Sequence, residues 1–212
     1  MRDWDVYLIT GQELSRGRTT PQVVEAALRA GVRVVQLREK DMSTRELLTL
    51  GQTVRALTRR FGAELIVNDR VDVALAIGAD GVHVGQADMP LPYVRRCLPA
   101  HMYVGVSVSN GEQVGVAEQA GADYLGVGPI FPTGSKSDTD PVLGLDGLRA
   151  IRAQTSLPIV AVGGITIINA QDVIQAGADC VSVISALTAA DDIIAAAEAL
   201  LHKVRQAQRR MK

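Results

Sequence analysis

Aromatic side chains are scarce in this sequence, at 3% of the residues, although 47% of the residues are hydrophobic. The apolar content therefore comes from valine, isoleucine, leucine and alanine, which suit strands buried on both faces. No hydrophobic run reaches the roughly 18 residues of a membrane-spanning helix. The N-terminus contains acidic residues and reads directly as a strand, not as a signal peptide. We therefore expect a cytoplasmic protein that does not bind membranes.

Cysteine is also rare, and the net charge is close to zero. Cys97 and Cys180 lie far apart without a CxxC pattern, which predicts buried or half-buried thiols with no metal or redox role. The formal net charge of −1 provides no overall field that would attract nucleic acid or an acidic membrane. An anionic ligand must then be held by a local site.

Strand and helix patterns alternate along all 212 residues. Strands are expected at 4–10, 32–39, 64–69, 81–85, 103–108, 124–130, 158–165 and 180–186. Amphipathic segments lie between them, and a Gly-Ala-Asp string at 78–80, 121–123 and 177–179 is expected to end helices in the left-handed conformation. Thr20-Pro21 and the pair Ser43 and Glu46 predict helix starts. The pattern predicts a single (β/α)₈ TIM-barrel domain spanning 1–212, with an open doubly wound sheet as the alternative.

In such a barrel the active site lies where the strands end. Gln36, Arg38 and Lys40 alternate at the end of the second strand, so they share one face. Arg38 and Lys40 together suit a polyphosphate, because one offers a two-pronged donor and the other a mobile charge. The alternative is a solvated charge pair with Glu39.

Carboxylates follow the third and fourth strands. Asn68-Asp69 ends the third strand and Asp88 follows the fourth. Two carboxylates beside a basic strand end suit Mg²⁺, which keeps open positions for water and phosphate oxygens. The alternative is that each aspartate only caps a helix.

The next two strands carry polar and small residues. His83 lies among apolar residues, which favours a hydrogen-bonded core residue over a base. The Ser107 hydroxyl can donate to a ring nitrogen or a phosphate. Gly126 and Gly128 are expected to leave space for a flat ring, whereas the spacing of Tyr124 indicates a core residue.

The longest loop, 131–141, combines hydroxyls, glycine, proline and one lysine. Its position predicts a lid in which Thr133, Ser135 and Lys136 bind phosphate oxygens, and the alternative is an ordinary polar surface loop. Gly163-Gly164 ends the seventh strand, and Ile184-Ser185 lies at the end of the eighth. Backbone N–H groups at these strand ends commonly bind phosphate.

These features add up to two anion-binding patches, one built from side chains and a metal, the other from backbone. The sequence lacks a Ser-His-Asp set, a cysteine nucleophile near a histidine and a zinc-ligand cluster. The pattern suits a reaction between two phosphorylated small molecules, one of which carries a diphosphate leaving group.

The motifs together resemble the thiamine phosphate synthase family over nearly the whole chain. They are QLREK at 36–40, ND at 68–69, HVGQ at 83–86 with Asp88, GPIFPT at 128–133, GGI at 163–165 and VISA at 183–186. The resemblance implies coupling of hydroxymethylpyrimidine diphosphate with hydroxyethylthiazole phosphate, which gives thiamine phosphate and pyrophosphate. It also implies a dissociative, Mg²⁺-assisted substitution.

The resemblance assigns roles by position. The diphosphate would be held by Arg38, Lys40, Asn68 and Lys136, with Mg²⁺ on Asp69 and Asp88. The pyrimidine pocket would contain Gln36, Ser107 and Tyr124, and the thiazole phosphate would be held by Thr133, Ser135, Gly164, Ile184 and Ser185. Arg38, Lys40, Ser107 and Lys136 would be the catalytic residues. For Tyr124 this role replaces the core position that its spacing indicates.

One departure from the family pattern and three open points remain. The family's lid usually reads Pro-Thr-x-Thr-Lys, whereas this chain has Gly134 and Ser135, which predicts slower ordering of the lid without loss of activity. A thiazole tautomerase-like relative and a non-catalytic phosphate-ligand binding protein are the alternative functions. Ile193, Ile194 and Leu200 can pack on the barrel or on a second copy, so a homo-oligomer is compatible with the sequence.

Overall fold

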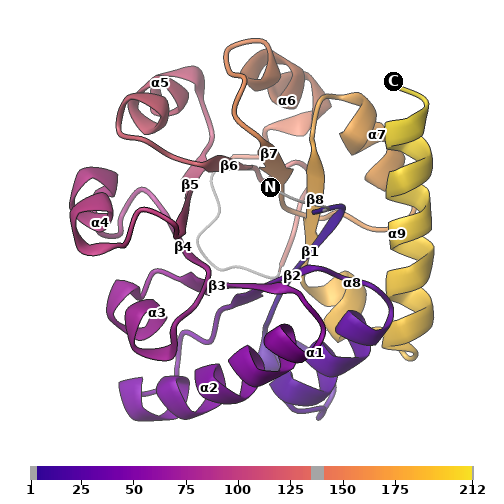
Figure 1. Ribbon diagram of the computed structural model, residues 1–212. Coiled ribbons are helices and arrows are strands. Elements are labelled where there is room, and N and C mark those ends of the chain that lie inside the picture. The colour runs from indigo at the N-terminus through magenta and orange to yellow at the C-terminus, as the bar shows by residue number, and fades with distance from the viewer. Residues whose placement is uncertain (1–3, 135–140, 212) are drawn as a thin grey trace.

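The computed structural model describes residues 4–134 and 141–211. Eight parallel strands close into a barrel in chain order, and the helices form an outer ring around them (Figure 1). The strands are β1 Val6–Ile9, β2 Val34–Leu37, β3 Glu64–Asn68, β4 Gly81–Val84, β5 Tyr103–Val108, β6 Tyr124–Val127, β7 Ile159–Ala161 and β8 Cys180–Val183. β1 pairs with both β2 and β8, which confirms the (β/α)₈ barrel and excludes the open sheet.

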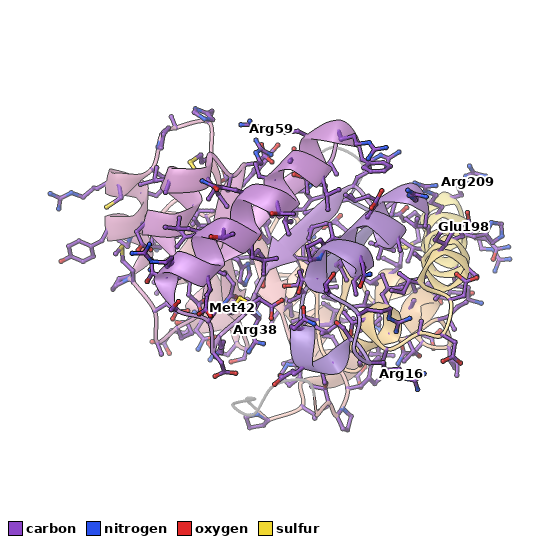
Figure 2. All side chains as sticks on the ribbon, turned by 90° about the horizontal axis from the view of Figure 1, so that it is seen from below. Arg16, Arg38, Met42, Arg59, Glu198 and Arg209 are labelled. Atoms are coloured by element: carbon purple, nitrogen blue, oxygen red, sulfur yellow. The ribbon has the colours of Figure 1, made fainter. Side chains whose placement is uncertain are left out.

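The connecting helices cover the outside of the barrel. They are η1 Gln12–Leu14, α1 Thr20–Arg29, α2 Thr44–Arg60, α3 Val71–Ile77, α4 Leu91–Cys97, α5 Gly111–Gln119, α6 Gly144–Arg152, α7 Ala170–Gln175, α8 Ser185–Thr188 and α9 Ile193–Arg209. Figure 2 shows Arg38 and Met42 at one end of the barrel and Arg59, near the end of α2, toward the other. Among the described residues, no helix combines the length and apolarity needed to cross a membrane.

Most strands divide their side chains between two hydrophobic clusters. Val6 and Leu8 pack in the large cluster shared with the helices, whereas Tyr7 and Ile9 belong to a smaller one inside the barrel. The interior cluster contains Trp4, whose ring meets that of Tyr124 edge-on with 5.3 Å between the centroids. Four of the seven aromatic residues, Trp4, Tyr7, Tyr103 and Tyr124, thus gather inside the barrel.

Helix ends follow the signals in the sequence. Thr19 and Gln22 form a capping box one residue before the predicted start of α1, and Ser43 and Glu46 form the predicted box for α2. The glycines of the repeated string adopt positive φ, with 61° at Gly78 for example. This conformation ends each helix as predicted.

The aspartates of the same repeat tie the helices to the strands. In each copy the carboxylate accepts a hydrogen bond from a backbone N–H at the start of an earlier strand and pairs with an arginine. The three sets are Asp80 with Leu65 N and Arg55, Asp123 with Val104 N and Arg95, and Asp179 with Ile159 N and Arg152. These ties lie at the N-terminal ends of β3, β5 and β7, a face of the barrel that serves stability.

Two sequence expectations need correction or refinement. Cys180 is buried as predicted, but Cys97 is exposed, because it lies in the last turn of α4 and faces away from the barrel. In α9, Ile193 and Leu200 are buried within this chain, whereas Ile194 is 37% exposed. Only Ile194 of these three therefore offers apolar surface.

Candidate active site

A cavity of about 400 Å³ opens at the C-terminal ends of the strands. This size suits a small organic ligand. Most of the predicted site residues line it: Arg38, Lys40, Asn68, Asp69, Asp88, Ser107, Thr133, Gly164, Ile184 and Ser185. The barrel thus brings together residues that are up to about 150 positions apart, because parallel strands end at one edge.

Two predicted residues do not line the cavity, and two others fall outside the described residues. Gln36 and Tyr124 are buried inside the barrel, 2% and 0% exposed, and lie outside the cavity lining. They reach the cavity only through the hydrogen bonds given below. Ser135 and Lys136 fall outside the described residues, so their roles stay predictions.

Asp69 and Asp88 form a pair of carboxyl groups beside the basic strand end. Burial, and after it the neighbouring carboxyl of Asp88, raises the pKa of Asp69 to about 7, while Lys40 and Arg38 oppose the rise. Asp69 has a φ of 60°, in the left-handed region. Arg70 lies at the N-cap position of α3 without a side-chain cap bond, so Asp69 does not cap that helix.

Asp88 has a structural role as well as a place in the cavity. Its Oδ2 accepts the backbone N–H of Gly85 at 2.7 Å, which fixes the loop after β4. α4 begins beyond Pro90 without a side-chain cap bond, so the capping alternative does not hold for Asp88 either. The Asp88 carboxyl group also forms a side-chain hydrogen bond with Asp69, so it both fixes the loop and meets the neighbouring carboxyl group in the cavity.

Arg38 and Lys40 follow β2 directly. The backbone N–H of Arg38 donates to Thr10 Oγ1 at 2.9 Å, which anchors the start of this segment. The Glu39 carboxylate accepts hydrogen bonds from Gln12 N at 3.0 Å and Thr20 Oγ1 at 2.9 Å, and forms no ion pair with Arg38. The predicted alternative of an Arg38–Glu39 charge pair is thus wrong, and Arg38 lines the cavity with its charge uncancelled by Glu39.

His83 is a cavity residue that the sequence analysis missed. Its Nδ1 lies 3.1 Å from Tyr124 Oη and its Nε2 lies 2.9 Å from Ser107 Oγ. It is hydrogen-bonded, as predicted, but it also lines the cavity. The alternation of side chains along β4 could have indicated this position, because His83 lies on the same side of the strand as Gly81 and Gly85. The parallel register also places His83 beside Asn68, another cavity residue.

The glycines of β6 make room for protein groups. A Cβ on Gly126 would lie 2.7 Å from His83 Cε1, and one on Gly128 would lie 2.1 Å from the carbonyl oxygen of Val162. Gly126 and Gly128 line the cavity, as expected for residues that leave space at the barrel mouth, but the space beside their Cα atoms is not empty. That space is filled by His83 and by the β7 backbone.

The backbone patch lies at β7 and β8. Gly163 and Gly164 have φ of 103° and 61°, and a Cβ on Gly164 would lie 2.6 Å from Pro132 O. Glycine is required here because the segment after β6 packs against it. Phe131 N donates to Gly163 O at 3.1 Å, which holds Thr133 near this patch at the cavity mouth.

The geometry defines a class of protein. The ends of β2, β3 and β4 contribute two cations, one amide and two carboxyl groups: Arg38, Lys40, Asn68, Asp69 and Asp88. The ends of β7 and β8, on the other side of the closed barrel, contribute backbone groups and Ser185. Among the described residues, no group of three His, Cys, Asp or Glu side chains could hold a metal alone. The site is that of a (β/α)₈-barrel enzyme for anionic ligands.

Comparisons with known proteins place the chain within this class. A family model described as thiamine monophosphate synthase matches residues 6–187. A thiamine-phosphate synthase of Chloroflexus aurantiacus is 55% identical over 198 residues, which cover 93% of this chain and 91% of the relative. One of Moorella thermoacetica is 50% identical over 208 residues, covering 98% and 99%.

A solved structure agrees. A thiamine phosphate pyrophosphorylase from Pyrococcus furiosus matches with a TM-score of 0.88 and 41% identity over 96% of each chain. The chain therefore belongs to the thiamine monophosphate synthase family, as the motifs predicted. It is an enzyme of the transferase class.

Proposed function

We propose that this enzyme joins hydroxymethylpyrimidine diphosphate to hydroxyethylthiazole phosphate, giving thiamine phosphate and pyrophosphate. The observation that carries the proposal is the placement of two different anion patches across one cavity of about 400 Å³. One patch has the charge and donors for a diphosphate, and the other has the backbone geometry for a monophosphate. A reaction between the two ligands needs this arrangement, because proximity removes much of the entropic barrier.

The donor set fits a magnesium ion. Asp88 lies close enough to Asp69 for its carboxyl group to raise the pKa of Asp69, and a divalent cation relieves that repulsion. Two carboxylates leave positions for water and diphosphate oxygens, which is the arrangement that Mg²⁺ prefers. When bound, the ion would neutralise charge on the diphosphate oxygens.

The chain's own residues would act mainly by electrostatics and positioning. Arg38, Lys40 and Asn68 would hold the diphosphate and stabilise the negative charge that grows on it as the C–O bond breaks. The departing pyrophosphate leaves a pyrimidine-methyl cation, and the thiazole nitrogen captures this cation to form the new C–N bond. Gly164, Ile184, Ser185 and Thr133 would hold the thiazole phosphate so that its ring lies within reach.

The segment after β6 would close the site. Thr133 lines the cavity, and we propose that Ser135 and Lys136 extend this grip, with Lys136 acting on the leaving group. A closed lid would exclude water, which competes with the thiazole for the cation. Gly134 and Ser135 would slow the ordering of the lid.

The remaining features of the proposal concern partners and location. The partners are small phosphorylated molecules, and the net charge of −1 gives no reason to expect nucleic acid or membrane binding. A cytoplasmic location and a homo-oligomer stay predictions. The whole chain, 1–212, is proposed to act as one domain.

A coupling assay tests the function. The purified protein is mixed with both phosphorylated substrates with and without Mg²⁺, and thiamine phosphate is detected after oxidation to its fluorescent thiochrome. We expect Mg²⁺-dependent product from the wild type and none from the double variant Asp69→Asn with Asp88→Asn. Asp146→Asn, an exposed aspartate on α6 outside the cavity, is the matched control and should retain full activity. No product from the folded wild type would refute the proposed reaction.

A further inference from the structure

A continuous chain of hydrogen bonds crosses the inside of the barrel and ends at the cavity. Gln36 Nε2 donates to Tyr7 Oη at 2.9 Å, and Tyr7 Oη lies 3.0 Å from Tyr124 Oη. Tyr124 Oη lies 3.1 Å from His83 Nδ1, and His83 Nε2 lies 2.9 Å from Ser107 Oγ. We call these five residues, from five different strands, the interior relay.

The amide of Gln36 sets the direction of the relay. An amide nitrogen only donates, so Tyr7 Oη accepts from Gln36. The buried hydroxyl hydrogen of Tyr7 also needs an acceptor, and Tyr124 Oη lies within reach, so we infer that Tyr7 donates to Tyr124. Tyr124 then gives its hydrogen to Nδ1 of His83. Burial raises the pKa of both Tyr7 and Tyr124, which are fully buried, so both hydroxyls keep the hydrogen that this order requires.

The direction determines what Ser107 presents to the cavity. With Nδ1 accepting, the neutral imidazole carries its hydrogen on Nε2 and donates it to Ser107 Oγ. The Ser107 hydroxyl oxygen therefore accepts a hydrogen bond from His83, and the hydroxyl hydrogen of Ser107 can be donated to another acceptor. Ser107 lines the cavity, so that hydrogen can serve a ligand there.

The strands are built around this relay. A Cβ on Gly105 would lie 2.0 Å from Tyr124 Cζ, and a Cβ on Gly126 would lie 2.7 Å from His83 Cε1. Any larger residue at either position would displace a ring of the relay. Neither Tyr7 nor Tyr124 lines the cavity, so their hydroxyl groups act on a ligand only through the other residues of the relay.

We propose that Tyr7 and Tyr124 are positioning residues that hold His83 in its Nε2–H tautomer, so that Ser107 offers a hydrogen to the ligand. The matching ligand group is an acceptor such as a ring nitrogen of the pyrimidine, and this identity rests on the proposed function. The opposite direction would offer a lone pair and would favour an amino group instead. The relay thus selects which edge of the heterocycle faces Ser107.

The tautomer is measured first, in the free enzyme and without substrate. Nitrogen NMR of ¹⁵N-histidine-labelled protein distinguishes the two tautomers, and His83→Gln identifies the signals of His83 among the three histidines. We expect the Nε2–H form in the wild type and a mixture in Tyr124→Phe. Tyr103→Phe is the matched control, because Tyr103 packs on Trp4 in the same cluster but hydrogen-bonds Glu64. An Nδ1–H form in the wild type, or no change in Tyr124→Phe, would overturn the proposal.

A double-mutant cycle then tests the link to the ligand. We expect Tyr124→Phe to lower kcat/KM for the pyrimidine diphosphate about tenfold and Tyr7→Phe about threefold, the range of a lost hydrogen bond. In a Ser107→Ala background, Tyr124→Phe should lower kcat/KM by less than a further twofold, since the effect of Tyr124 passes through Ser107. Additive losses, or an equal loss in Tyr103→Phe, would show a purely structural role. If the wild type makes no thiamine phosphate, the proposed function fails, while the NMR result still decides the direction of the relay.

Discussion

Asp69 combines a left-handed backbone, a raised pKa and a neighbouring carboxyl at one position. Its φ of 60° is uncommon outside glycine, although aspartate and asparagine adopt it more readily than most residues. Its pKa of about 7 reflects burial first and Asp88 second. Such strain and repulsion are typical of functional sites, where they are kept at the expense of stability.

The first prediction concerns Asp69→Asn. Asparagine tolerates the same φ and removes one charge, so we expect the metal-free protein to gain about 1 kcal/mol in the free energy of unfolding at pH 8. Because the folded pKa lies above the unfolded one, the stability that protonated Asp69 contributes is lost as pH rises from about 4 to about 7. The gain of the variant should therefore shrink below pH 7 and vanish near pH 4. Urea unfolding in EDTA at several pH values measures the difference in unfolding free energy between the variant and the wild type. A difference that does not depend on pH would contradict the assignment of the gain to the Asp69 charge.

The second prediction concerns Gly105. Gly105→Ala should lower the free energy of unfolding by about 3 kcal/mol, because the added methyl overlaps the Tyr124 ring. The control is Gly115→Ala in α5, where the new methyl would meet nothing within 4 Å and helix propensity should raise stability by up to about 1 kcal/mol. Urea unfolding of both variants makes the comparison. Equal stability of the two variants would show that the barrel interior adjusts freely around Tyr124.

Single residues at strand ends can be predicted from the sequence, but their contacts with distant strands cannot. Arg38, Asp69 and Asp88 were found because their side chains stand out at predicted strand ends, and the cavity contains all three. His83 was missed because its hydrogen-bond partners come from other strands. The family resemblance placed Gln36 and Tyr124 in the pocket, whereas the spacing of Tyr124 indicated the core position that it occupies. Contacts between strands distant in sequence depend on barrel register, which a single sequence does not encode locally.

At the scale of the elements, all eight strands were predicted, but most were predicted too long. The second strand was expected over 32–39 and observed over Val34–Leu37. Alternating side chains continue past the last ladder hydrogen bond, because the extended chain goes on into the loop that carries Arg38. Functional residues therefore lie just outside the strands, where the pattern alone does not show that pairing has ended.

The aspartates of the Gly-Ala-Asp repeat give the third prediction. Asp80→Ala should cost about 2 kcal/mol of unfolding free energy, since it leaves Arg55 and the Leu65 N–H without their partner in a largely buried site. The kcat should stay unchanged, because Asp80 lies at the end of the barrel away from the cavity. Asp146→Ala, in an exposed pair with Arg149, should leave stability unchanged. A loss of kcat in Asp80→Ala at a temperature where it is fully folded would contradict this division of roles.

The whole molecule is a closed ring of strands, in which each strand pairs with two neighbours. Removing one strand breaks the ring at two places, so we predict that the chain unfolds as a unit. Trp4, the single tryptophan, reports on the barrel interior by fluorescence, and circular dichroism reports mainly on the outer helices. The two signals should give coincident urea transitions. Separate midpoints would show independent parts and would contradict the single domain expected for 1–212.

We propose that one cavity holds two anionic ligands at separate patches. Calorimetry tests it most directly: hydroxyethylthiazole phosphate is titrated into the protein with Mg²⁺, in the absence and in the presence of saturating inorganic pyrophosphate. We predict that pyrophosphate changes the Kd for the thiazole phosphate by less than about threefold, and that Arg38→Ala weakens only pyrophosphate binding. Mutually exclusive binding of the two ligands would contradict the account, because a single anion patch cannot position two phosphorylated substrates for coupling.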